Sequence, residues 1–157
     1  MAKKSSKNKV LPIHILNGPN LNLLGSRQPE IYGKTTLAQI EKACRARAKE
    51  HGFSILFDQS NKEGELVEMI QRARTASSAV IVNAAAYTHT SVAVLDALKM
   101  LSVPVIEVHL SNPARREDFR HKSYVAMGAT GTITGLGLNS YLLAIDAIAG
   151  ILKGKTV

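Results

Sequence analysis

Short runs of apolar residues alternate along the chain with longer segments in which apolar residues recur every three or four positions. A short apolar run between polar or glycine-rich stretches is typical of a buried strand, and the longer recurrence is typical of one helix face. The pattern predicts strands at residues 10–16, 53–58, 79–83, 103–110 and 131–135. It predicts helices at residues 35–52, 63–76, 90–101 and 139–154.

Strands that alternate with helices form parallel sheets, because each crossover helix returns the chain to the same edge of the sheet. The pattern therefore predicts an α/β protein with a flavodoxin-like, doubly wound, five-stranded parallel sheet and helices on both faces. We expect one domain over residues 10–157, preceded by a disordered basic tail at residues 1–9. In such sheets ligands bind beyond the carboxyl ends of the strands, so the residues that follow each strand are the first site candidates.

Composition narrows the class of protein. The net charge of +8 would suit a nucleic-acid-binding protein, but six of the 20 basic residues lie in two tails without acidic residues. Removing those six leaves 14 basic residues against 12 acidic ones in the body, so we expect no nucleic-acid partner. Cys44 is the only cysteine, which excludes an intrachain disulfide and favours a cytoplasmic location. No apolar run approaches the roughly 20 residues of a membrane span, so we expect no membrane partner.

Polar side chains gather where the predicted strands end. The first four strands run into "NGPN", "DQSN", "NAAAYTHTS" and "EVHLSN". Asn, Ser and Thr are common helix caps and turn formers, and we interpret Asn61 and Ser91 in that way. Capping does not account for His89 and His109, which are therefore candidates for a functional site.

The end of the fourth predicted strand places a carboxylate beside an imidazole. Glu107 and His109 are two residues apart, so both side chains point to the same face of the strand. A neighbouring carboxylate orients an imidazole and favours its protonated form. Taken alone, the pair fits a general acid and an incidental ion pair about equally well.

Arginines follow in "ARREDFRHKSY". Arg116 and Arg120 are four residues apart, so on a helical turn they face the same way. Such a pair suits either a fork for an anionic substrate or a solvated basic surface, and the spacing leaves both open.

The segment "LGSRQPEIYGKTT", residues 24–36, is unusual for a loop. Gly25, Pro29 and Gly33 predict a loop, because glycine permits unusual backbone angles and proline interrupts helices and central strands. The same segment carries Arg27 and Tyr32, a cation and a phenol five positions apart. A loop that only contacts water does not need such a pair, so the pair is a candidate for a functional role.

Several chemistries are excluded by the motifs that the sequence lacks. It contains no GxxxxGK[ST] phosphate loop, no GxGxxG dinucleotide motif, no GxSxG nucleophile turn and no HExxH metal motif. The histidines have no companion cysteines, so we expect no metal site.

Four long motifs together resemble one family. "NGPNLNLLGSRQPEIYG", "QSNKEGELVEMI", "YTHTSVAVLDAL" and "IEVHLSNPARREDFRHKSY" are similar, in order and spacing, to the type II 3-dehydroquinate dehydratases over residues 13–149. The resemblance implies removal of water from 3-dehydroquinate to give 3-dehydroshikimate, by trans elimination through an enolate, without a cofactor. The reaction serves both aromatic amino-acid biosynthesis by the shikimate pathway and quinate breakdown, and the residues do not separate these roles.

The resemblance also implies roles for individual residues. Residues 24–36 would form a mobile lid in which Tyr32 is the base and Arg27 stabilises the tyrosinate. Asn20 would stabilise the enolate through an ordered water. His109 would act as the general acid, oriented by Glu107. The matching substrate contacts are Asn83, His89, Arg120 and the backbone of Leu110 and Ser111.

A homododecamer, arranged as four trimers, is implied as well, with Asp96 donated to the site of the neighbouring subunit. The sequence favours an oligomer independently, because the predicted helices at 90–101 and 139–154 are apolar on more sides than one sheet face can cover.

The chain departs from the family at three places: Gln28, where many relatives have Glu; Ala84-Ala85, where relatives often have Pro-Gly or Ala-Gly; and Pro113-Ala114. These departures bear on lid movement and substrate affinity rather than on the reaction.

The alternative from another functional class is a non-catalytic ligand-binding module on the same fold. A flavin-binding module would need more aromatic residues, and a receiver domain would need acidic residues where Asn17 and Asn83 stand.

Overall fold

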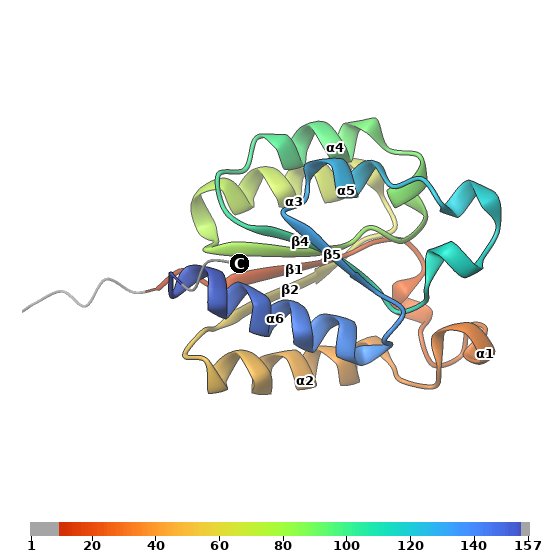
Figure 1. The fold of residues 1–157 in the computed structure, drawn as a ribbon, viewed down its shortest axis with the longest axis horizontal. Helices are drawn as coiled ribbons and strands as arrows, with labels where there is room; N and C mark the ends of the chain where they lie inside the picture. Colours follow the sequence, from red (N-terminus) through yellow and green to blue (C-terminus); the bar gives the residue numbers. More distant parts are fainter. Residues whose placement is uncertain (1–9, 155–157) are drawn as a thin grey trace, which may run out of the picture.

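The strands form one parallel sheet, which confirms the predicted fold class. The structure, a computed structural model, describes residues 10–154; the predicted tail at 1–9 and the last three residues of the predicted domain lie outside this range. The sheet has the order β2-β1-β3-β4-β5, with every neighbouring pair parallel (Figure 1). This order is the flavodoxin-like one. The strands are β1 (Ile13–Asn17), β2 (Ile55–Gln59), β3 (Ala79–Asn83), β4 (Val105–His109) and β5 (Gly131–Thr134).

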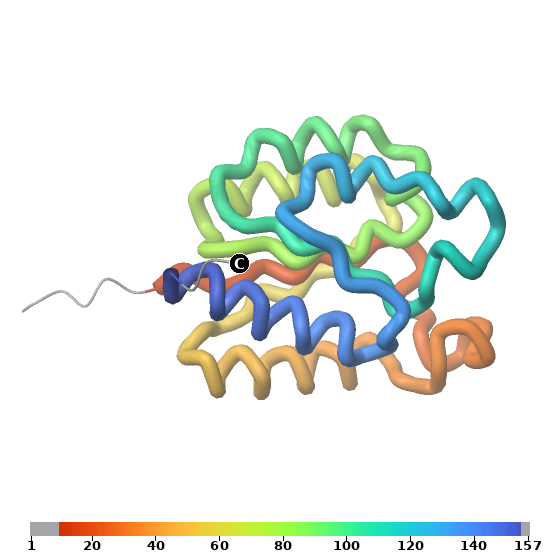
Figure 2. Tube along the Cα trace, viewed as in Figure 1, coloured from red at the N-terminus to blue at the C-terminus, as the bar shows by residue number. Residues whose placement is uncertain are grey.

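Helices cover both faces of this sheet (Figure 1, Figure 2). One face carries α2 (Leu37–Glu50) and α6 (Leu138–Leu152), and the other carries α3 (Glu63–Ala76), α4 (Val92–Lys99) and α5 (Tyr124–Gly128). Successive side chains of a strand point to opposite faces. Ile15 therefore packs in the core under α2 and α6, whereas Leu16 packs in the core under α3 and α4. No helix within residues 10–154 is both long and apolar enough to cross a membrane.

Two short helices are not predicted by the sequence pattern. α1 (Pro29–Tyr32) lies inside the segment that we expect to be a loop. Proline is accepted there because it occupies the first turn, where its missing N–H has no helical partner to lose. α5 follows Ser123, whose hydroxyl accepts a hydrogen bond from the backbone N–H of Ala126 at 2.9 Å. Both helices are too short to show an apolar repeat.

The apolar side chains of α4 and α6 that exceed what one sheet face can cover are buried only in part. On α4, Leu95 and Leu98 are buried, whereas Val92 and Met100, at its two ends, are 51% and 50% exposed. On α6, Leu143 is exposed, but most of the remaining apolar side chains pack against the sheet and against the neighbouring α2. Exposed apolar side chains therefore remain on both helices: Val92 and Met100 at α4, and Leu143 and Leu152 on α6.

The chain turns sharply after β1, directly beside the end of β3. The backbone N–H of Gly18 donates to the carbonyl oxygen of Asn83 at 2.8 Å. A Cβ atom at Gly18 would lie 2.4 Å from the carbonyl oxygen of Ala84, a distance at which backbone must move. Glycine is thus required for the two loops to approach each other.

Replacing this glycine should be costly. Gly18→Ala should lower the free energy of unfolding by about 2 kcal/mol or more, because a methyl group is forced against backbone. The matched control is Gly64→Ala in α3, where nothing lies within 4 Å of the added Cβ; it should be neutral or stabilising by up to about 1 kcal/mol. Urea unfolding followed by circular dichroism measures both, and equal midpoints for the two variants would contradict the close approach.

Candidate active site

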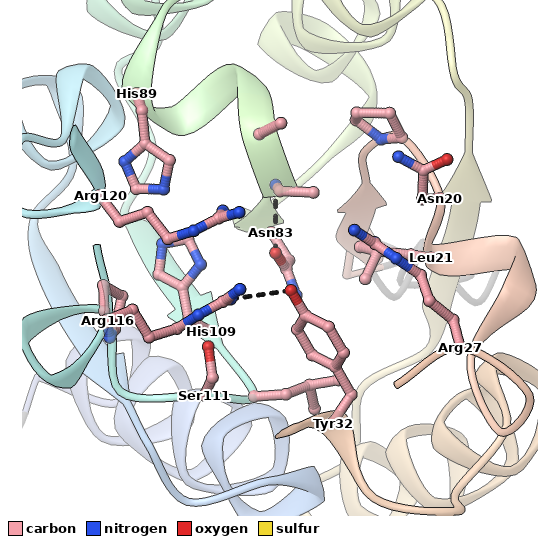
Figure 3. A pocket seen from close by; sticks show the side chains of 15 residues that line it. Asn20, Leu21, Arg27, Tyr32, Asn83, His89, His109, Ser111, Arg116 and Arg120 are labelled. Carbon is pink, nitrogen blue, oxygen red and sulfur yellow. Dashed lines mark hydrogen bonds between the residues drawn. The ribbon is translucent and has the colours of Figure 1, made fainter. Parts of the chain in front are cut away.

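A cavity opens at the carboxyl ends of β1, β3 and β4 (Figure 3). Its empty space is about 570 Å³, the open mouth included. Its floor lies where the strand order reverses between β1 and β3, the usual ligand position in doubly wound sheets. The predicted site residues that line it are Asn20, Arg27, Tyr32, Asn83, His89, His109, Leu110, Ser111 and Arg120.

Tyr32 lies between two arginines. The Nη1 atom of Arg116 donates to the Tyr32 hydroxyl at 2.8 Å. The guanidinium carbons of Arg27 and Arg116 lie 5.3 Å and 5.4 Å from the centroid of the phenol ring. Both guanidinium groups therefore lie against the phenol ring, and Arg116 also contacts its hydroxyl. Arg27 was expected beside the tyrosine from the sequence, whereas the hydrogen bond from Arg116 was not.

His109 is paired with Glu107, as the strand period predicts. His109 Nε2 lies 2.7 Å from Glu107 Oε1, and Glu107 is only 2% exposed. The same carboxylate oxygen accepts a hydrogen bond from the hydroxyl of Ser123 at 2.7 Å. Glu107 does not line the cavity itself, so it acts behind the imidazole. Ser123, the residue that caps α5, was not identified from the sequence.

The ring of His89 is held in place by a hydrogen bond at its Nδ1 atom. Its Nδ1 lies 2.8 Å from the carbonyl oxygen of Lys122, and a carbonyl only accepts, so Nδ1 carries the proton. Burial lowers the pKa of His89 below its usual value, and the nearby charges of His109 and Arg120 lower it further. At neutral pH His89 is therefore an uncharged ring whose Nε2 can accept a hydrogen bond. The rings of His89 and His109 are stacked, with centroids 6.4 Å apart.

A buried polar trio holds the floor of the cavity. The Tyr141 hydroxyl donates to Asn17 Oδ1 at 2.8 Å and accepts from Asn83 Nδ2 at 2.9 Å. Asn83 Oδ1 accepts from the backbone N–H of Ala85 at 3.2 Å. Tyr141 is completely buried, and this burial raises the pKa of its hydroxyl far above the usual value. The hydroxyl therefore remains a donor, and Asn83 keeps one N–H for a ligand.

Both arginines of the predicted fork line the cavity, although no helix joins them. Arg116 follows one short 3₁₀ helix, Pro113–Arg115, and Arg120 ends a second, Asp118–Arg120. Arg120 Nε donates to Glu117 Oε2 at 2.8 Å, so one side of its guanidinium is occupied. Both arginine side chains are mostly buried in the cavity wall, which argues against a solvated basic surface, and their action as one fork for an anion stays a prediction.

Asp96 lies apart from this cavity. It is exposed on α4 and does not line the site of its own chain. Its predicted role in a neighbouring subunit's site therefore stays a prediction. Among residues 10–154, no group of three or more His, Cys, Asp and Glu side chains is placed to hold a metal ion.

Two of the three departures occupy strained backbone. Gln28, the residue before α1, has φ 39°, and Ala85, on the cavity wall, has φ 50°. Residues with a Cβ rarely adopt this left-handed region. Gly25 and Gly33, which flank the same segment, also have positive φ angles, where glycine is expected. In the third departure, Pro113 lines the cavity, whereas Ala114 is exposed.

The buried trio gives a clear test of the cavity floor. Tyr141→Phe should lower the free energy of unfolding by about 1–3 kcal/mol, because Asn17 Oδ1 and Asn83 Nδ2 both lose their hydrogen bond to the buried hydroxyl. The control is Tyr124→Phe, which removes a hydroxyl that contacts only exposed Lys122 and should change stability by less than about 0.5 kcal/mol. Thermal and urea unfolding of both variants provide the measurement; a Tyr141→Phe protein as stable as the control would contradict the trio.

A flavodoxin-like sheet with a phenol, two arginines and a carboxylate–imidazole pair at its switch point defines an α/β protein built for acid–base chemistry. The family described as dehydroquinase class II matches residues 11–149, and the chain belongs to this family. The 3-dehydroquinate dehydratase of Caulobacter sp. (strain K31) is 58% identical over 142 residues, which cover 90% of this chain and 97% of the relative. That of Streptomyces avermitilis is 54% identical and covers 89% of each chain.

Solved structures show the same relationship. The type II dehydroquinase from Propionibacterium acnes has a TM-score of 0.85 at 41% identity, covering 90% of this chain and 99% of its own. The one from Butyrivibrio crossotus has a TM-score of 0.86 at 38% identity, covering 88% and 97%. The family expected from the sequence motifs is thereby confirmed.

Proposed function

We propose that the protein is a 3-dehydroquinate dehydratase, a hydro-lyase that converts 3-dehydroquinate to 3-dehydroshikimate. The observation that carries the proposal is the pairing of two chemically opposite groups in one cavity: a phenol beside two guanidinium groups, and an imidazole backed by a buried carboxylate. Relatives that are more than half identical bear the same activity in their names. A shikimate-pathway role is part of the proposal, and breakdown of quinate is the alternative use of the same reaction.

The first step assigns the base to Tyr32. Its phenolate takes a proton from the carbon beside the ketone, and the electron pair of that C–H bond forms an enolate. An unperturbed tyrosine ionises near pH 10, so the phenolate needs electrostatic help at neutral pH. Arg27 and Arg116 supply positive charge on its ring and hydroxyl. Asn20, on the cavity wall, stabilises the enolate oxygen through a water.

The second step assigns the acid to His109. The enolate reforms the ketone, the carbon–carbon double bond forms, and the C–O bond to the hydroxyl breaks. Protonated His109 gives its proton to that oxygen, which leaves as water. Glu107 stabilises the imidazolium before transfer and fixes the ring. The reaction is balanced by the two proton transfers and requires no redox cofactor.

The remaining cavity residues hold the substrate. The free N–H of Asn83 and the backbone of Leu110 and Ser111 suit the carboxylate. His89, uncharged and accepting through Nε2, suits a ring hydroxyl, as does the unoccupied side of Arg120. The uncharged state of His89 supports recognition of a hydroxyl rather than of the carboxylate.

The proposal is tested by adding 3-dehydroquinate and following the ultraviolet absorbance of the conjugated product. Tyr32→Phe should lower kcat about 10²–10⁴-fold, since it removes a general base, and should fold normally because Tyr32 is only half-buried. Tyr124→Phe, the same change outside the cavity, should keep wild-type turnover. A Tyr32→Phe protein with most of its kcat would overturn the assignment of the base.

We further propose a cytoplasmic homododecamer, a tetramer of trimers, in which Asp96 completes a neighbouring site. Val92, Asp96 and Met100 are spaced by four residues and are all exposed, so they form one stripe along α4. An apolar stripe around a carboxylate is unfavourable in water and favours contact with a second copy. Cys44 is the single cysteine of the sequence, and a chain that forms no intrachain disulfide fits a reducing compartment.

Mixing variants tests the shared site. Arg27→Ala and Asp96→Ala proteins should each have low activity, and joint unfolding and refolding should restore part of it, because about one site in four then has both residues intact under random assembly. Light scattering after size exclusion should show the same dodecamer for both. Fully active monomers, or mixtures with only the average of the two activities, would contradict the shared site.

A further inference from the structure

Asn61, in the loop after β2, joins three loops at the rim of the cavity. Its side-chain Oδ1 accepts a hydrogen bond from the backbone N–H of Asn20 at 2.9 Å. Its carbonyl oxygen accepts one from the hydroxyl of Tyr87 at 2.8 Å. Gln59 Nε2 donates to the same Oδ1 at 3.1 Å and to the carbonyl oxygen of Gly18 at 3.2 Å. The loops after β1, β2 and β3 therefore meet at this one residue, through its side chain and its backbone carbonyl.

The orientation of both amides follows from the backbone. The Asn20 N–H can only donate, so Asn61 must present its oxygen to it. Gln59 must then present its NH₂ group to that oxygen, and the same NH₂ group reaches the carbonyl of Gly18. Each contact fixes the next, and neither amide can be reversed without losing hydrogen bonds.

Asn61 is not the helix cap that its sequence position suggests. The cap position of α3 is Lys62, without a side-chain cap, and the N–H of Lys62 is bonded to Ser60 Oγ at 3.0 Å. Ser91, by contrast, caps α4 as expected through its bond from the Val94 N–H. The side chain of Asn61 is thus left for Asn20 and Gln59.

Asn20 depends on such support. Its φ angle is 67°, in the left-handed region, and it follows a proline. Its side chain lines the cavity but forms no hydrogen bond within residues 10–154. The direction of its amide is therefore set by its backbone, and the bond to Asn61 is what fixes the N–H of that backbone.

We propose that Asn61, oriented by Gln59, is a positioning residue that holds Asn20 in place to stabilise the enolate. The proposal rests on the proposed function, because it gives a task to the Asn20 amide. Neither Asn61 nor Gln59 lines the cavity, so both act only through the loop. A donor to a developing oxyanion works by being held in place beforehand, and a loosened Asn20 should therefore slow the reaction while substrate binding is kept.

Two substitutions at Asn61 distinguish the loss of its hydrogen-bond acceptor from a change that keeps an acceptor in a side chain of similar shape. Asn61→Leu removes the acceptor and should lower kcat about tenfold with KM within twofold. Asn61→Asp keeps an oxygen for both donors and should stay within about threefold of wild type. Lys62→Leu, the same change one residue further on at an exposed position, should be unaffected. Circular dichroism and light scattering establish that each variant is folded and assembled.

A second comparison asks whether Asn61 acts through Asn20. Asn20→Gly removes the amide but keeps the left-handed backbone accessible, and should lower kcat about 10²-fold or more. Adding Asn61→Leu to Asn20→Gly should then slow the enzyme by less than twofold. If Asn61→Leu slows the Asn20→Gly enzyme as much as it slows the wild type, or leaves the wild type unchanged, the proposal is overturned.

Hydrogen exchange provides a readout that does not depend on turnover. In Asn61→Leu, exchange in the peptide covering residues 18–24 should be at least tenfold faster, and in Asn61→Asp it should be unchanged. Unchanged exchange in Asn61→Leu overturns the positioning role even if the dehydratase activity is real. Wild-type protein without dehydratase activity overturns the proposed function, whereas faster exchange would still uphold the Asn61–Asn20 contact.

Discussion

The close approach of the loops after β1 and β3 is the constraint on which the site depends. Gly18 lies against the backbone of Ala84, and one strand residue from each side, Asn17 and Asn83, is bonded to the same Tyr141 hydroxyl. In a parallel sheet the two crossovers leave in opposite directions at this point. The gap they leave becomes a binding site only if the strand ends are held together, and the buried hydroxyl of Tyr141 does this from the face that α6 covers.

The cavity combines two opposite electrostatic environments. On the Tyr32 side, two guanidinium groups lie against the phenol. On the His109 side, a carboxylate that is almost fully buried lies against the imidazole. Groups whose surroundings favour opposite charge states are those that exchange protons with a substrate between them. Burial lowers the pKa of His89, so this ring adds a hydrogen-bond acceptor to the cavity without adding a positive charge at neutral pH.

Much of this arrangement could be predicted from the sequence, and the features that could not be predicted have identifiable physical reasons. The alternation of strands and helices predicts the sheet, and the strand period of two predicts the Glu107–His109 pair. The bond between Arg116 and Tyr32 joins residues 84 positions apart, and no local period reports such a contact. Asn61 is interpreted from its place before α3 as a cap or turn former, but its side chain accepts a hydrogen bond from the backbone N–H of Asn20, 41 positions away, and no local pattern reports such a contact. The sequence pattern does not predict α1, because a proline indicates the interruption of a helix unless it is known to lie in the first turn.

The origin of Tyr141 in α6 has a consequence for the protein during its synthesis. Tyr32, His109 and the arginines are all translated before this helix, yet the hydroxyl that joins the ends of β1 and β3 belongs to Tyr141. A nascent chain that has released β1 to β4 from the ribosome carries every proposed proton-transfer group but not the hydroxyl that unites the cavity floor. Assembly of the site is therefore coupled to completion of the domain, and incomplete chains lack a properly formed site.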